Sequence, residues 1–351
     1  MPKMLKVGVV GFQRGMHLAT CLRHVAGAEL AAVCDLRSEV ETTVREGFPG
    51  ARFFTDYGDL LGCGVDAVMI ASPPQTHADY TIRALDRGLH VLCEVPAFHE
   101  RREMAPLVRA VRHTKAVYMF AENVLYWAFV HSVRQRIKSG DLGRIMYAEA
   151  EYVHDVPALL GPGSWRRGYP PIQYCTHSLG PVLEWMDDGI VTAVALHTGV
   201  QRRPDLESIN MEAALFRTES GSVIKLLCGF SVAREPAFHR YVLYGTGGYF
   251  EKTAPMDGGS EYFLYTEREG PGRPVRMPFS QTWASDADDP QLRAFHGGAD
   301  YRMVKDFVES ILEGRPSPVG IDKAVRMTLP GICAHESAEQ CGQPVAVEAD
   351  L

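Results

Sequence analysis

The feature that most constrains the fold is a glycine-punctuated turn near the start of the chain. An apolar run, Lys6-Val7-Gly8-Val9-Val10, leads into Gly11-Phe12-Gln13-Arg14-Gly15, and a helix is expected from about Gly15 to Val25. A second apolar run, Leu30-Ala31-Ala32-Val33-Cys34, ends on Asp35. This order is typical of a βαβ unit whose turn brings a helix N-terminus to the pyrophosphate of a dinucleotide. Asp35 follows Gly11 by 24 residues, close to the roughly 20 expected for an acid that binds a ribose hydroxyl.

The glycine pattern itself departs from the dinucleotide fingerprint. Counted from Gly11, G-x-G-x-x-G would need glycine where the chain has Gln13 and Met16, so Gly15 would supply the helix-packing glycine one place early. Taken alone, such a turn is typical of any tight strand-to-helix connection. The two strands, the turn, the helix and the terminal acid together favour a bound dinucleotide.

Size and charge narrow the class of protein. A chain of 351 residues is expected to form two domains, because single cores stop growing near ~250–300 residues. The net charge of −7 gives no electrostatic basis for binding nucleic acid or an anionic membrane. No apolar run approaches a membrane span and no signal peptide is evident, so a cytoplasmic protein is expected. The eight cysteines lack C-x-x-C spacing, which favours reduced thiols and no metal site.

The first third of the chain alternates between strands and helices. Further strands are expected at residues 52–54, 65–71, 90–94 and 117–120, with helices at about 38–46, from the prolines after Ser72 to Gly88, and at 103–114. Such a series predicts a doubly wound parallel sheet, a Rossmann domain over residues 1–124. Ligands bind beyond the carboxyl ends of its strands, which places Gln13, Asp35, Pro74, His77, Glu94 and Asn123 along one rim.

The pattern changes after a helix expected at about residues 126–139. Strands at 144–154, 191–197, 211–217, 223–230 and 241–245 follow with few helices between them. This predicts an open, mostly antiparallel sheet with one covered face, in a domain of residues 125–351. Helices are expected at 179–186, 301–313 and 321–340, and the C-terminal helices are candidates for packing back across the interface.

Several motifs in this order resemble the glucose-fructose oxidoreductase / inositol dehydrogenase / MocA family. They include Val65-Asp66-Ala67-Val68-Met69-Ile70-Ala71-Ser72-Pro73-Pro74 and Gly88-Leu89-His90-Val91-Leu92-Cys93-Glu94. The family usually has a lysine where this chain has Val95, and an aspartate where it has Gln173. Those departures, with Tyr174-Cys175-Thr176-His177-Ser178-Leu179-Gly180-Pro181 and His296-Gly297-Gly298-x-Asp300, resemble the branch of NAD-dependent α-N-acetylgalactosaminidases.

The resemblance implies NAD as cofactor, a carbohydrate substrate and a set of site residues. The implied catalytic residues are His177 and Tyr174. Implied or candidate substrate contacts are Tyr152, His154, Asp155, Arg166, Thr176 and His296. Cofactor contacts are expected at Gly11, Gln13, Arg14, Gly15, Asp35, Ser72, Pro74, Gln75, Thr76, His77, Glu94, Val95 and Asn123.

The residue types suit proton transfer. His177 has an unperturbed pKa near 6.5, which suits a base that accepts a hydroxyl proton while hydride leaves the same carbon. Tyr174 could relay that proton only if a cation lowers its pKa from about 10, and Arg166 or Arg167 is the candidate for that charge. A core or helix-capping role remains the alternative for His177. For His154 the alternative to a metal ligand is a strand-end histidine bonded within its own loop.

Three functions stay open from the sequence. The first is redox-neutral glycoside cleavage that starts with hydride transfer at a ring carbon, most simply C3. The second is a simple sugar or polyol dehydrogenase, although none of the eight lysines falls in a candidate site motif. The third is a nucleotide-binding sensor or scaffold without turnover. An open sheet face also suggests a homodimer or higher homo-oligomer.

Overall fold

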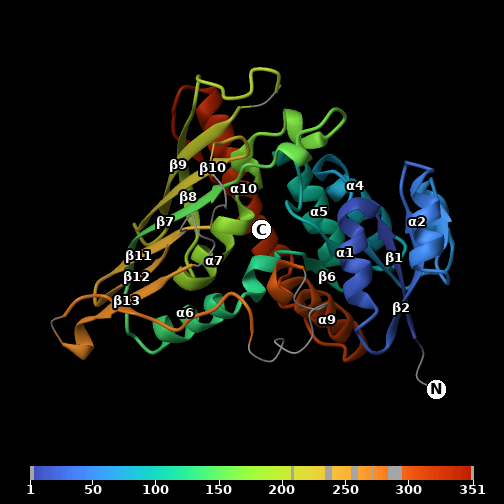
Figure 1. Cartoon of the computed structure of the whole chain (residues 1–351), viewed down its shortest axis with the longest axis horizontal. Helices are drawn as coiled ribbons and strands as arrows, with labels where there is room; N and C mark the ends of the chain where they lie inside the picture. Colours follow the sequence, from blue (N-terminus) through green and yellow to red (C-terminus); the bar gives the residue numbers. More distant parts are fainter. Residues whose placement is uncertain are drawn as a thin grey trace. The chain divides into compact units, whose positions relative to one another are not determined.

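The computed structural model describes residues 4–206, 209–233, 239–253, 260–270, 272–283 and 295–348. The chain divides into two compact units: Met1–Tyr126 with Thr282–Val325, and Trp127–Gln281 with Arg326–Ala349 (Figure 1). The helix α9 (Ala299–Leu312) belongs to the first unit, and α10 (Ile321–Glu339) begins there and continues into the second. No helix of the described residues is long and apolar enough to span a bilayer.

The first unit is built on a parallel sheet. In the described residues its strand order is β3-β2-β1-β4-β5-β6, so the chain reverses direction across the sheet between β1 and β4. Buried residues on both faces of the central strands explain the continuous apolar runs in the sequence, whereas the edge strand β3 has only exposed and half-buried residues. The strands are β1 (Leu5–Val10), β2 (Ala28–Cys34), β3 (Arg52–Phe54), β4 (Ala67–Ile70), β5 (His90–Cys93) and β6 (Tyr118–Phe120).

Helices from the first 126 residues and the later helix α9 cover this sheet. Leu18 of α1 and Phe307 of α9 lie in one buried cluster with Val9, Met69 and Leu92 of the sheet. The helix α4 packs against α5 and against β5. The helices of this unit are α1 (Phe12–Leu22), α2 (Val40–Gly47), α3 (Tyr57–Gly62), α4 (His77–Leu85), α5 (Arg101–His113) and α9.

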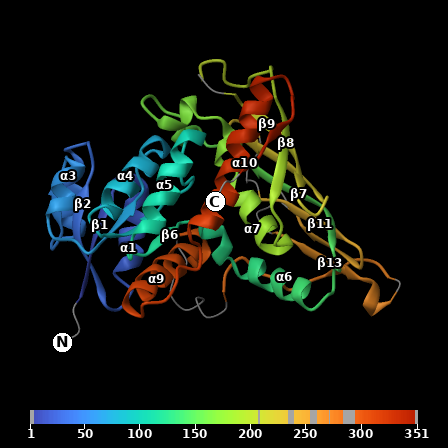
Figure 2. The same cartoon turned by 180° about the vertical axis from the view of Figure 1, so that it is seen from behind.

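The second unit is built on a mostly antiparallel sheet, which both views show beside its own helices (Figures 1 and 2). The order in the described residues is β14-β13-β12-β11-β7-β10-β9-β8-β15, and only β7 and β10 pair in parallel. Its elements are α6 (Ala128–Lys138), β7 (Ile145–Val153), α7 (Thr176–Met186), β8 (Ile190–His197), β9 (Met211–Thr218), β10 (Val223–Gly229), β11 (Tyr241–Gly245), β12 (Gly248–Lys252), β13 (Tyr262–Thr266), β14 (Val275–Arg276) and β15 (Val345–Ala346).

One face of this sheet is buried and the other is exposed. Side chains of β9 alternate strictly between buried and exposed positions. On the covered face α7 packs against β7, and Trp185 of α7 contacts Tyr241 and Phe250 while its indole N–H donates to the Val130 carbonyl at 2.9 Å. The predicted fold, a Rossmann domain followed by an open, mostly antiparallel sheet domain with helices, is confirmed.

Two helix starts differ from the sequence predictions. The helix α1 begins at Phe12 rather than near Gly15, because the strand already breaks at Gly11, whose φ is 81°. The helix α7 begins at Thr176, three residues before its expected start, with Pro181 inside it. Thr176 and His177 therefore lie in a first helical turn rather than in the preceding loop. The short elements α3, β12, β13, β14 and β15 were not predicted.

Candidate active site

The turn after β1 leaves the N-terminus of α1 open to an anion. A Cβ at Gly11 would lie 2.6 Å from the Ala71 carbonyl oxygen, and one at Gly15 would clash with Val9, so both positions need glycine. Within α1, which the structure describes in full, the N-cap residue supplies no side-chain cap and the first turn holds no acid. No side chain of the first turn of α1 therefore neutralises the positive partial charge at this helix end, which fits binding of a dinucleotide pyrophosphate. Gln13 is exposed there.

Asp35 lies at the carboxyl end of β2, in the place predicted for an acid that binds ribose. Its Oδ2 accepts the Phe12 backbone N–H at 2.8 Å, and the Arg37 guanidinium donates to both of its oxygens at 2.9 Å. Burial alone would raise the pKa of Asp35, but these hydrogen bonds outweigh burial and hold that pKa below its ordinary value. The residue is therefore a carboxylate that Arg37 partly neutralises.

The segment after β4 is held by hydrogen bonds within the first unit. Ser72 Oγ lies 2.7 Å from Thr76 Oγ1, Pro74 is buried and Gln75 is exposed. The buried imidazole of His77 places Nδ1 2.7 Å from the Pro96 carbonyl and Nε2 2.8 Å from the Ser72 carbonyl. Burial lowers the pKa of His77. The His77 ring thus lies between the segments that follow β4 and β5, which shapes the rim of the sheet.

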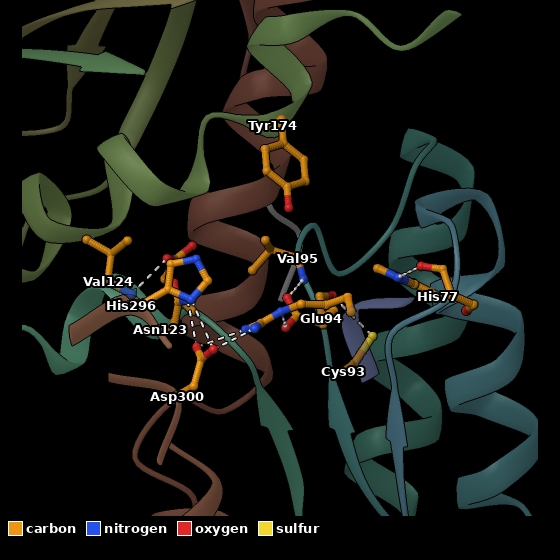
Figure 3. Close-up of polar contacts among 12 residues, drawn as sticks. His77, Cys93, Glu94, Val95, Asn123, Val124, Tyr174, His296 and Asp300 are labelled. Atoms are coloured by element: carbon orange, nitrogen blue, oxygen red, sulfur yellow. Dashed lines mark hydrogen bonds and ion pairs between the residues drawn. The ribbon is translucent and has the colours of Figure 1, made fainter. Parts of the chain in front are cut away.

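Beyond β5 and β6 a charged network gathers residues from four parts of the chain. The Arg14 guanidinium donates Nε to Glu94 Oε1 at 2.8 Å and both terminal nitrogens to Asp300. Asn123 Nδ2 and His296 Nδ1 also reach Asp300, at 2.9 and 3.0 Å (Figure 3). The predicted cofactor residues Arg14, Glu94 and Asn123 are thereby brought together with His296. Val95 is buried, and its N–H donates to Glu94 Oε2 at 3.2 Å.

In the second unit, Tyr152 of β7 is surrounded by the rings of the predicted catalytic pair. The ring centroid of Tyr152 lies 5.4 Å from that of His177 and 5.9 Å from that of Tyr174. Tyr174 and His177 meet edge to face at 5.2 Å, because Tyr174 ends a short 3-10 turn (η5, Pro171–Tyr174) and His177 lies in the first turn of α7. The chain is thus already coiled at Tyr174, five residues before the helix start expected from the sequence.

Arg166, rather than Arg167, lies beside Tyr174. Its Nη2 is 3.4 Å from the Tyr174 hydroxyl oxygen, and its guanidinium carbon lies 4.6 Å from the Tyr174 ring centroid. Arg167 instead donates to the backbone carbonyls of Leu160 and Asp205. Only the first arginine is in position to favour a tyrosinate at 174.

The remaining predicted substrate residues have structural contacts in this unit. His154 is partly buried, with its ring centroid 5.6 Å from that of Tyr152. Asp155 Oδ1 accepts a hydrogen bond from Arg202 Nη1 at 2.8 Å. Thr176 is fully buried, and its hydroxyl has no hydrogen-bond partner in the described part of the chain. Orphaned hydroxyls of this kind need a partner, and a ligand can supply it.

Two neighbours of Tyr152 escaped the sequence analysis. The rings of Phe230 and His239 lie 6.0 and 5.1 Å from Tyr152. Phe230 follows β10 directly, and the parallel pairing of β10 with β7 brings it beside β7. The spacing of residues along the chain does not reveal which distant strands pair. No sequence motif could therefore have placed Phe230 beside Tyr152. In the described residues no group of three or more His, Cys, Asp or Glu side chains is arranged to hold a metal ion.

Comparison with known proteins places these residues in a family. Residues 5–122 match the model of the oxidoreductase family with NAD-binding Rossmann fold, and residues 130–251 match that of the GFO/IDH/MocA C-terminal domain. A glycosyl hydrolase family 109 protein of Shewanella baltica is 30% identical over an alignment of 349 residues, which covers 86% of this chain and 76% of the relative.

Solved structures agree in fold. An oxidoreductase domain protein from Kribbella flavida has a TM-score of 0.83 at 18% identity, covering 99% of this chain and 100% of the other. Scyllo-inositol dehydrogenase from Lactobacillus casei, solved with NAD(H) and scyllo-inositol, has a TM-score of 0.77 at 19% identity, covering 98% and 99%. The family resemblance stated from the sequence is confirmed, and the curated relative carries the name of a glycosidase family. The chain belongs to the GFO/IDH/MocA oxidoreductase family, and residues 5–122 match its NAD-binding Rossmann domain.

Proposed function

We propose that this protein cleaves a glycoside by a redox-neutral route in which hydride leaves a sugar ring carbon, C3, and later returns to it. The relative named as a glycosyl hydrolase family 109 protein supports a glycoside as substrate. Val95, where the wider family usually has lysine, supports a route other than lysine-assisted dehydrogenation. NAD, held at the turn after β1, supplies the hydride acceptor.

The observation that carries the proposal is the contact of Tyr174 with both His177 and Arg166. Two proton-handling groups stand edge to face at 5.2 Å, and the cation within 3.4 Å of the phenol oxygen favours its ionised form. The route needs such a pair, because one proton leaves the C3 hydroxyl and another leaves C2. A single base would have to release its first proton before taking the second.

The chemistry balances without an external oxidant. The C3 hydrogen leaves as hydride and the hydroxyl proton goes to the base, which gives a C3 ketone. The ketone acidifies C2–H, and removal of that proton breaks the bond from C1 to its substituent, which departs with the electron pair and takes up a proton. Water then adds at C1 and gives up a proton, a proton returns to C2, and the hydride returns to C3 while the C3 oxygen takes up a proton.

The remaining site residues have proposed roles that follow from their chemistry. We propose that Arg166, Tyr152, His154, Asp155, Thr176 and His296 bind sugar hydroxyls. The proposed cofactor contacts are those predicted from the sequence: the turn residues Gly11 to Gly15, Asp35, the segment Ser72 to His77, Glu94, Val95 and Asn123. In this scheme Asp35 holds the adenine-side ribose, which favours NAD over NADP.

Turnover in heavy water tests the route. The pure protein is incubated with a panel of glycosides without added oxidant, and the released sugar is analysed by NMR. Deuterium at C2 with no net NADH supports the proposal. Stoichiometric NADH with an unexchanged C2 would show a simple dehydrogenase instead, and neither product, with NAD demonstrably bound, would favour a sensor.

We also propose a cytoplasmic homo-oligomer that associates through the exposed face of the nine-stranded sheet. That face carries large side chains, Leu215 of β9 at 49% exposure and Tyr244 of β11 at 46%. Tyr147 pairs across from Tyr244 on the same face. Light scattering checks this: Leu215→Lys with Tyr244→Lys should convert a dimer or tetramer to a smaller species.

A further inference from the structure

Asp300 is a buried carboxylate whose two oxygens are fully occupied by three side chains. It lies in the first turn of α9 and has no exposed surface. Oδ1 accepts from Arg14 Nη2 at 2.8 Å and from Asn123 Nδ2 at 2.9 Å, and Oδ2 accepts from Arg14 Nη1 at 2.5 Å and faces His296 Nδ1 at 3.0 Å. One side chain thus joins the nucleotide turn, the end of the sheet and the segment before α9.

This carboxylate is ionised. Burial opposes its charge, but the Arg14 guanidinium outweighs burial and holds the pKa of Asp300 well below its ordinary value. An ionised carboxylate only accepts hydrogen bonds. The atom of Asn123 that faces it must therefore be the amide nitrogen, which removes the usual ambiguity between the two ends of an asparagine amide.

The other end of that amide is an unsatisfied acceptor. Asn123 is 3% exposed, and its Oδ1 has no hydrogen-bond partner in the part of the chain that the structure describes. A buried oxygen without a partner costs about 1–3 kcal/mol, so a ligand that donates to it is favoured. Asn123 follows β6, which ends at Phe120, at the carboxyl edge of the sheet where ligands of this fold bind.

The strand order indicates which part of NAD donates. Asp35 follows β2, and Asn123 follows β6 four strands away, a separation of about 19 Å at the usual strand spacing. The two residues lie on opposite sides of the reversal between β1 and β4, across which a dinucleotide extends. If Asp35 is on the adenine side, Asn123 is on the nicotinamide side, and the donor there is the carboxamide NH₂.

We infer that Asp300 is a positioning residue for the cofactor: it fixes the Asn123 amide so that Oδ1 accepts a hydrogen bond from the nicotinamide carboxamide. The same carboxylate holds Arg14 with Glu94, which keeps the guanidinium in the network. The substitution Asp300→Asn would remove the charge that holds Arg14. The new amide could present either its oxygen or its nitrogen to Asn123. The amide of Asn123 would then lose its fixed orientation.

Calorimetric titration with NAD⁺ and with ADP-ribose, which lacks nicotinamide, tests the inference. Asn123→Ala and Asp300→Asn should each weaken NAD⁺ binding by about 5–10-fold, the range for one lost hydrogen bond. Neither should change the affinity for ADP-ribose. The loss of NAD⁺ affinity in the double variant should not exceed the larger of the two single losses, because both changes remove the same contact. Lys305→Ala, an exposed change on α9, is the matched control.

Three results would overturn the inference. Equal losses for NAD⁺ and ADP-ribose would make Asp300 a support of the whole nucleotide site. Unchanged NAD⁺ affinity in Asn123→Ala would show that Asn123 makes no contact with the carboxamide. Additive losses of affinity in the double variant would show that Asp300 and Asn123 act independently. If Asp300→Asn does not fold, Asp300→Glu keeps the charge and displaces the carboxylate. It should show the same loss for NAD⁺ alone.

Discussion

His335 Nδ1 lies 2.8 Å from Glu212 Oε1, and the other oxygen of Glu212 accepts the Ile172 backbone N–H at 3.0 Å. Glu212 is 1% exposed. The buried pair thereby attaches α10 and β9 to the turn that carries Tyr174. Although burial lowers the pKa of His335, the hydrogen bond and charge of Glu212 outweigh it, and the pKa of His335 lies above its ordinary value.

The pair should make stability depend on pH. A raised folded-state pKa contributes stability that is fully present below the unfolded value near 6.5 and is lost as pH rises through the folded value. His335→Gln should therefore cost about 1–3 kcal/mol of unfolding free energy at pH 6 and less at pH 9. Denaturant unfolding at both pH values measures this. His197→Gln, which removes an imidazole 3.8 Å from Glu339 in a more exposed pair, is the control and should change little. Equal losses at both pH values would contradict the ion pair.

The Asp35–Arg37 pair should set cofactor preference. NAD(H) should bind more tightly than NADP(H), because the Asp35 carboxylate repels a 2′-phosphate. Asp35→Asn should narrow that preference and leave Arg37 free to bind the phosphate, whereas Arg37→Ala should widen it. Titration of both cofactors against each variant checks this, with the exposed Arg45→Ala as control. Tighter NADP(H) binding by the unaltered protein would overturn the assignment.

Tyr174 and His177 should act together on protons. Tyr174→Phe and His177→Ala should each reduce turnover by about 10²-fold or more, the range for lost acid–base catalysis, with NAD affinity nearly unchanged. Steady-state rates and NAD titration measure the two effects. His113→Ala, at the exposed end of α5, is the control. Near-normal rates in both site variants would contradict their role in catalysis and make His154 the next candidate for the catalytic base.

Substitutions at the neighbouring residues Arg166 and Arg167 should have different effects on turnover. Arg166→Lys should lower turnover by about 10-fold or more, because lysine keeps the charge but not the planar contact with the Tyr174 ring. Arg167→Lys should have a smaller effect, since that side chain bonds backbone carbonyls of Leu160 and Asp205. Comparing the pH dependence of the two rates separates a charge effect on Tyr174 from lost packing. Similar losses for both would contradict a role for Arg166 in ionising Tyr174.

Local patterns predicted much of the fold and some of the site. Continuous apolar strands and the Gly11 turn predicted the parallel sheet, whereas the helix that carries His177 starts three residues earlier than expected. The network around Asp300 joins residues 14, 94, 123 and 300, and its contacts depend on tertiary packing that no local period encodes. His239 was missed for the same reason, since it meets Tyr152 only through the pairing of β11 with β7. Short elements such as β14 lack enough residues to show a period.

The place of α9 has a consequence for how the chain is made. Leu18 and Leu22 of α1 share a buried cluster with Met303 and Phe307, so the first 126 residues leave part of their apolar surface uncovered. A growing chain must carry that exposed face through the synthesis of strands β7 to β14 of the second sheet before α9 emerges to cover it. An N-terminal fragment ending near Tyr126 would also lack Asp300. The nucleotide-binding unit is therefore discontinuous in sequence, and it is completed only once α9 has been made.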